Sequence, residues 1–168
     1  MMRSIFLAPL LLLSACGLQP LYSGGNAGPV AATLASVSVA PIEGKAGWLM
    51  QAALTDRIQA ASSPRYNLKV ELDDKITGFG VRRDDAVTRE RRTLRARYQL
   101  VENATGETVL DATAGSDAGI DVVSSDYATI AAENTALERL TGVVADQIVS
   151  RVALYAKRTA AAAPAADK

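Results

Sequence analysis

The chain has 168 residues, of which 18 are basic and 18 acidic, so its formal charge of zero gives no general case for nucleic-acid binding. It contains no histidine and one cysteine, which excludes an internal disulfide and removes the commonest general base and zinc ligand. We therefore expect one globular domain without a catalytic residue, a bound metal or a dissociable cofactor.

The N-terminus is typical of a bacterial lipoprotein. Arg3 precedes an apolar run over residues 5–13, which is too short to cross a bilayer and predicts a signal peptide over residues 1–15. Small residues stand directly before Cys16, the chain's only cysteine, as in a lipobox. We expect Cys16 to become the first mature residue and to carry a covalent N-acyl diglyceride lipid with palmitate-type chains, an anchor strengthened by about 0.8 kcal/mol per buried methylene.

Two other interpretations of this segment stay open. The first is an ordinary signal peptide with an incidental cysteine, and the second is a short uncleaved anchor. Gly17, rather than an aspartate, follows the cysteine, and in this the sequence resembles lipoproteins that are sorted to the outer membrane. The lipidated N-terminus and a Gly-rich flexible tether are expected to occupy residues 16–33.

The first part of the body predicts a strand and a helix. Apolar and small polar residues alternate over residues 34–40, as in a strand with one buried face. Residues 48–62 lack proline and glycine, and Met50, Leu54 and Ile58 form one apolar stripe. This helix is expected to end at Ser63 and Pro64.

Three further strands are expected to form a meander. Alternation predicts strands over residues 66–79, 94–101 and 108–114, with Gly78 marking a bulge. The charged stretch over residues 82–92 would then lie at the tip of a hairpin.

A second helix is expected over residues 126–157. Its apolar residues recur at steps of three and four, Ser125 or Asp126 can cap its start, and Gly142 is a plausible bend. The low-complexity residues 158–168 are expected to form a disordered tail.

The predicted fold is an α+β two-layer sandwich over residues 34–157. Its order is strand, helix, strand, strand, strand, helix. A four-stranded, mostly antiparallel sheet would carry both helices on one face.

Arginine is concentrated in the meander's first hairpin, between the predicted strand over residues 66–79 and the first part of the strand over residues 94–101. Seven arginines against three acids give residues 82–97 a local charge of +4, although the whole chain is neutral. Arginine grips phosphate or carboxylate with two hydrogen bonds. The candidate anion-binding residues are Arg82, Arg83, Arg89, Arg91, Arg92, Arg95 and Arg97.

These arginines also have a purely structural explanation. Charged side chains keep exposed sheets soluble and discourage edge pairing, which accounts well for Arg95 and Arg97 on an open sheet face. The run Ser124 to Tyr127 places serine beside aspartate, but without a histidine it favours a helix cap over a nucleophile.

The heptapeptide from Cys16 to Tyr22, Cys-Gly-Leu-Gln-Pro-Leu-Tyr, resembles the start of mature LPS-assembly lipoproteins, the LptE family. Leu18 stands where an aromatic residue is common in that family. Chain length, element order and the long C-terminal helix fit the same resemblance.

The resemblance implies a fold of two helices on a four-stranded sheet and an outer-membrane location. It also implies that the protein plugs the large β-barrel LPS-assembly protein, assists its folding and binds lipopolysaccharide through the basic hairpin, here residues 82–92 with Arg95 and Arg97. Two other functions stay open: an auxiliary lipoprotein of a phospholipid ABC transporter, and an envelope-anchored hydrolase.

Overall fold

The computed structural model describes residues 28–81 and 87–162. In chain order, the elements are α1 (Pro29–Ala35), β1 (Val37–Val39), α2 (Gly44–Ile58), β2 (Tyr66–Val81), β3 (Val87–Glu102), β4 (Thr108–Asp121) and α3 (Asp126–Ala162). Cys16, Arg82, Arg83 and most of the predicted tether lie outside the described residues.

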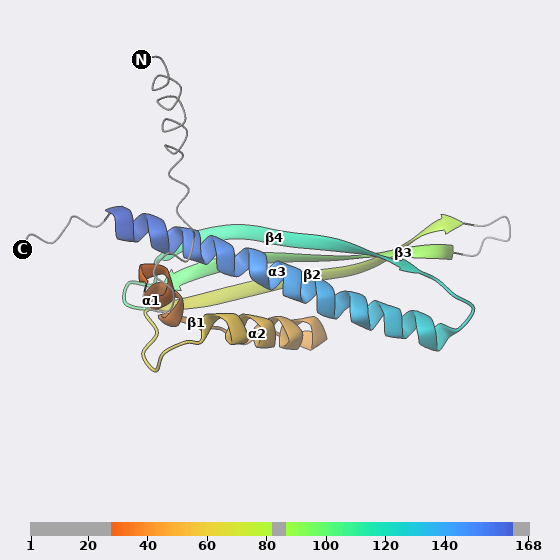
Figure 1. Cartoon of the computed structure of the whole chain (residues 1–168), viewed down its shortest axis with the longest axis horizontal. Coiled ribbons are helices and arrows are strands. Elements are labelled where there is room, and N and C mark those ends of the chain that lie inside the picture. Colours follow the sequence, from red (N-terminus) through yellow and green to blue (C-terminus); the bar gives the residue numbers. More distant parts are fainter. Residues whose placement is uncertain (1–27, 82–86, 163–168) are drawn as a thin grey trace, which may run out of the picture.

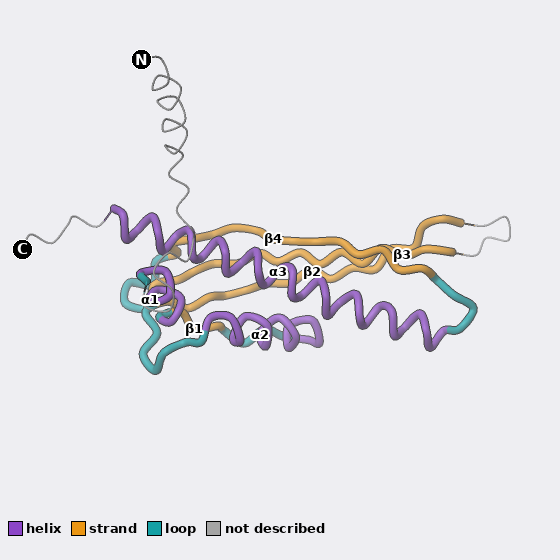
Figure 2. The backbone as a smooth tube through the Cα atoms, in the orientation of Figure 1, coloured by secondary structure: helices purple, strands orange, loops and turns teal. Residues whose placement is uncertain are grey.

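The strands form one open sheet in the order β1-β2-β3-β4. β1 is parallel to β2, and the other neighbours are antiparallel. The long α3 runs along the sheet with α2 beside it, so the molecule is elongated (Figures 1 and 2). The predicted α+β class, strand number and strand order are confirmed, and one further helix, α1, is present.

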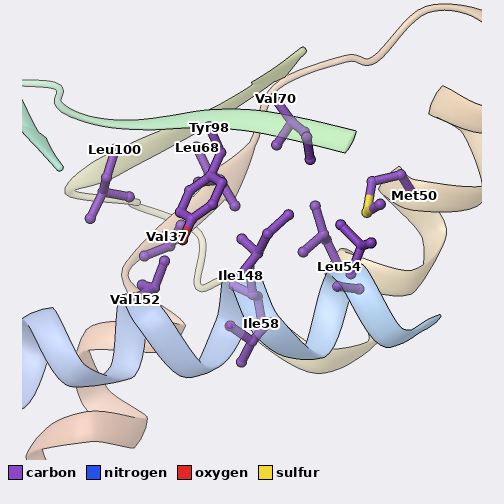
Figure 3. Close-up of a cluster of buried hydrophobic side chains, with 14 of the residues drawn as sticks. Val37, Met50, Leu54, Ile58, Leu68, Val70, Tyr98, Leu100, Ile148 and Val152 are labelled. Atoms are coloured by element: carbon purple, nitrogen blue, oxygen red, sulfur yellow. The ribbon is translucent and has the colours of Figure 1, made fainter. Parts of the chain in front are cut away.

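The core lies between the sheet and the helices (Figure 3). Because side chains alternate along a strand, the even-numbered apolar residues over 66–72 of β2 and 94–100 of β3 point to the helix side, and their polar and charged neighbours point to the other. Each fully buried leucine or valine contributes about 1.5–3 kcal/mol. The fully buried side chains include Val37, Met50, Leu54, Leu68, Tyr98, Leu100, Ile148 and Val152.

α1 replaces part of the predicted tether and strand. Pro29 fits the first turn of a helix, where the missing N–H costs nothing. Val30 and Leu34, one helical turn apart, are both buried in the core. Packed helical structure is therefore already present from Pro29, ahead of the predicted start at residue 34, and β1 is limited to Val37–Val39.

α2 lies four residues earlier than expected. It begins at Gly44 and ends at Ile58, because Gln59 adopts a left-handed conformation with φ of 48°. The amide of Gln59 bonds the carbonyl of Thr55, which closes the last turn. The predicted stop at Ser63 and Pro64 is therefore too late.

α3 is one helix of 37 residues, about 55 Å long at 1.5 Å per residue. It continues through Gly142 without a break and extends to Ala162, beyond the expected end at residue 157. Ser125 caps its start by accepting the amide N–H of Ala128 at 3.4 Å.

The three long strands extend beyond the predicted boundaries. β3 begins at Val87, inside the stretch expected to form the hairpin tip, and β4 continues to Asp121. The register passes through Gly78 without a bulge, and the irregularity lies instead at Leu100 and Val101. Pairing with β2 and β4 satisfies the backbone of β3 on both sides, which overrides its polar sequence.

Within the described ranges, no helix combines the length and apolarity needed to cross a membrane. The same part of the chain contains no cluster of three or more acidic, histidine or cysteine side chains suited to a metal ion.

Candidate functional site

Four of the candidate arginines line one side of β3. Leu94 and Ala96 are buried on the helix side, so the odd-numbered residues of β3 point to the face that none of the described helices covers. We call this the open face. Its arginine stripe consists of Arg89, Arg91, Arg95 and Arg97.

Three members of the arginine stripe are paired with aspartates of β4. Arg89 Nε lies 3.0 Å from Asp121 Oδ1, and Arg95 Nη2 lies 3.6 Å from Asp117 Oδ1. The neighbouring strand therefore supplies carboxylates along the same face.

The third pair is bidentate. Arg97 donates from Nε and Nη2 to the two oxygens of Asp111, at 3.3 and 2.9 Å, and Gln99 donates to the same carboxylate at 2.9 Å. These hydrogen bonds, with that from Arg97 the largest contribution, lower the pKa of Asp111. A ligand anion must therefore compete with an occupied carboxylate at this position.

Arg91 differs from the rest of the arginine stripe. Its guanidinium carbon lies 5.4 Å from the centroid of the Phe79 ring, and no described acid forms an ion pair with it. Its register partner on β4 is Gly119, where an added Cβ atom would meet nothing within 4 Å. The guanidinium of Arg91 thus lies against an aromatic ring, and the residue opposite Arg91 on β4 carries no side chain.

Arg92 points to the opposite side of the sheet. Its Nη2 and Nε lie 2.5 and 2.8 Å from the carboxylate oxygens of Asp74, and Nη1 donates to the backbone carbonyl of Glu133 at 2.9 Å. Its side chain is 10% exposed. The hydrogen bond to Asp74 raises the pKa of Arg92. Arg92 therefore joins β2, β3 and α3, and does not belong to the exposed arginines.

Glu90 also faces the helix side, near Glu133 of α3. One of its carboxyl oxygens, Oε2, is buried without a hydrogen-bond partner within the described part of the chain. Burial raises the pKa of Glu90, and the nearby Glu133 raises it further.

A comparison with known protein families identifies the chain's relatives. The model of the LptE family, described as "Lipopolysaccharide-assembly", matches residues 34–152. The chain belongs to the LptE family. The match includes β1, α2, all three long strands and most of α3, so the predicted family is confirmed.

Solved structures share this LptE fold at low sequence identity. A lipoprotein from Caulobacter crescentus CB15 is 23% identical with a TM-score of 0.66, over 77% of this chain and 98% of that one. Lipoprotein B from Nitrosomonas europaea is 10% identical with a TM-score of 0.57, over 76% and 86% of the two chains.

Rare lipoprotein B from Shewanella oneidensis is 8% identical with a TM-score of 0.52, over 75% and 95% of the two chains. At these identities the likeness concerns the fold alone. A search of curated proteins found no match.

The sequence identified the arginines but missed their partners. It predicted correctly that Arg95 and Arg97 lie on an open face. It grouped Arg92 with them, but strand alternation places Arg92 on the helix side of the sheet. The signal for the missed acids is the spacing of Asp111, Asp117 and Asp121, which are all odd-numbered and therefore share one face of β4.

Proposed function

We propose that this LptE-family chain is a non-enzymatic outer-membrane lipoprotein, anchored through acylated Cys16, that occupies and supports a β-barrel LPS-assembly protein and binds lipopolysaccharide. The family match over residues 34–152 carries this proposal. The sequence from Arg3 to Cys16 supports the membrane anchor, because it has the order of a signal peptide and lipobox.

The lipopolysaccharide contact is assigned to the open face near the hairpin. Arg91 has no acidic partner among the described residues, and Arg89 forms an exposed ion pair whose arginine side chain is 64% exposed. Exposed ion pairs are weak, so the phosphate of a glycolipid can displace the carboxylate. Arg82 and Arg83 extend the same basic segment in the sequence.

The partner is tested by purification of the native lipidated protein from outer membranes. Recovery of a stable complex with a large barrel protein is the expected result. Recovery with an inner-membrane transporter would instead favour the auxiliary-lipoprotein function, and a bare Cys16 sulfur by mass spectrometry would remove the anchor.

The ligand surface is tested by a variant in which Arg82, Arg83, Arg89 and Arg91 are replaced by serine. Arg92 is left intact, because it stabilises the fold. Lipopolysaccharide binding should weaken while the circular dichroism spectrum stays unchanged. Arg139→Ser, an exposed arginine on α3, is the control for loss of positive charge. Undiminished binding would exclude this surface and leave the barrel role intact.

A further inference from the structure

A hollow lies between α3 and the edge strand β4, on the helix side of the sheet and away from the arginine stripe. Its volume is ≈ 490 Å³. None of the described residues that line it is acidic. They are Tyr98, Ala112, Thr113, Ala114, Gln147 and Arg151.

Two hydrogen-bond donors of this hollow have no protein partner within the described residues. Arg151 is exposed and forms neither an ion pair nor a hydrogen bond there. Tyr98 is 2% exposed as a residue and its hydroxyl has no hydrogen bond among the described residues. The hydroxyl oxygen is not one of the fully buried unpartnered atoms, so it reaches the space of the hollow. Tyr98 and Arg151 line the same hollow, and Arg151 acts to lower the pKa of Tyr98 against the raising effect of burial.

The strand edge adds a third donor. Both backbone groups of Gly115 bond the side chain of Gln147, so they point away from β3. Val122, an even-numbered residue directly after β4, behaves in the opposite way: its amide N–H donates to the carbonyl of Thr88 in β3. Because the two orientations alternate in an antiparallel pair, the N–H of Thr113 also points outward, on the side of the hollow.

An apolar hollow adjoins the polar one. It has a volume of ≈ 490 Å³ and shares Gln147 and Arg151 with its neighbour. Val143 and Leu154, which line it, are 45% and 37% exposed. A cluster of donors therefore continues directly into an exposed apolar surface.

We propose that this groove binds a phosphate group, which accepts hydrogen bonds from the Arg151 guanidinium, the Tyr98 hydroxyl and the Thr113 amide. Arginine suits this role because its planar fork matches phosphate oxygens. No described residue lining the polar hollow is a carboxylate, and Asp146, which lines the adjoining hollow, is paired with Arg57 at 2.6 Å, so the fork of Arg151 is available. Where the phosphate belongs to a lipid, its acyl chains pack on Val143 and Leu154. This site goes beyond the proposed function, since it lies on the opposite side of the sheet from Arg91.

The test is isothermal titration of the purified full chain with two probes, inorganic phosphate and the soluble short-chain lipid dihexanoyl phosphatidate. We expect saturable binding. Arg151→Gln should weaken it about tenfold or more, because a hydrogen bond to a charged group is lost, and Tyr98→Phe about fivefold. Tighter binding of the phosphatidate identifies a lipid as the source of the phosphate, whereas equal binding identifies free phosphate.

Two controls keep the result specific. Arg139→Gln removes the same charge from α3 outside both hollows and should not change binding of these probes. The titrations are repeated in the Arg91→Gln background, which lacks the candidate lipopolysaccharide contact. Saturable binding that persists there and is weakened by Arg151→Gln belongs to this groove, so the two sites are tested separately. Equal losses in Arg151→Gln and Arg139→Gln, or no saturable binding of either probe, would overturn the site.

Discussion

The side chain of Gln147 pairs with both backbone groups of Gly115. The amide N–H of Gly115 donates to Gln147 Oε1 at 3.1 Å, and Gln147 Nε2 donates to the carbonyl of Gly115 at 3.4 Å. β4 is an edge strand of 14 residues without lysine, arginine or proline, which are common protections of such edges. One helix side chain thus takes the place of a neighbouring strand at the middle of this edge.

Replacement of Gln147 by alanine should expose this edge. The free energy of unfolding should fall by about 0.5–1.5 kcal/mol, since two backbone groups lose their partner and gain only water. Urea denaturation measures the loss, and light scattering at high protein concentration should show increased self-association. Ser150→Ala on the same helix is the control. Unchanged stability and solubility of the alanine variant would show that Gln147 does not protect the edge.

Arg92 should matter for stability more than for ligand binding. Replacement by alanine leaves Asp74 partly buried without its cation and frees the carbonyl of Glu133, which should cost about 2–4 kcal/mol. Chemical denaturation measures this loss.

Arg91→Ala is the matched control, since among the described residues Arg91 forms no ion pair and lies over the partly exposed Phe79 ring. It should change stability by less than about 0.5 kcal/mol. The double replacement Arg92→Met with Asp74→Leu should recover most of the stability, because no unpaired charge remains. Equal effects of Arg91→Ala and Arg92→Ala would contradict the different roles assigned to these neighbours.

Local patterns predicted most of the sheet, because alternation over β2 and β3 reflects one buried face. They failed at the boundaries of β3, where the residues near Val87 are polar and owe their strand conformation to pairing on both sides. They also missed α1, whose short sequence becomes helical because Val30 and Leu34 pack on the core.

The candidate site was predictable only in part. Alternation alone separates Arg92 from Arg91, so the burial of Arg92 could have been deduced from the register of β3. The pairing of Arg97 with Asp111 could not, since it depends on how β4 aligns with β3 across the irregularity at Leu100 and Val101. Long-range register is not encoded in the local pattern of either strand.

Gly119 offers a way to inactivate Arg91 without removing it. Its register partner is Arg91, and a side chain added there has open space. Gly119→Asp should supply the carboxylate that the other stripe arginines already have. Lipopolysaccharide affinity should then fall up to about fivefold, the effect of one exposed ion pair.

A lipopolysaccharide binding assay checks this expectation. Gly119→Ala and Gly119→Asn are the controls for the added side chain and its polarity, and both should bind as the wild type does. If Gly119→Asn loses as much affinity as Gly119→Asp, the effect is steric and the role of charge at Arg91 is not supported.

Glu90 should make stability depend on pH. Its pKa is raised in the folded protein, mainly by burial and further by Glu133, while Asp74 is neutralised by Arg92 in the same layer. A raised pKa means that folding favours the protonated carboxyl. Ionisation of Glu90 therefore costs no folding stability below the unfolded pKa of about 4.3, and the cost grows as the pH rises from there through the folded pKa.

Glu90→Gln, which keeps the shape and removes the charge, should therefore stabilise the protein at pH 7 relative to the wild type. The difference should shrink as the pH falls below about 4, where the wild-type carboxyl is protonated in both states. Thermal unfolding of both proteins across this range measures it, and Glu138→Gln, at an exposed position of α3, controls for loss of one negative charge. A stability gain that is the same at both ends of the pH range would mean that packing, and not ionisation of Glu90, is responsible.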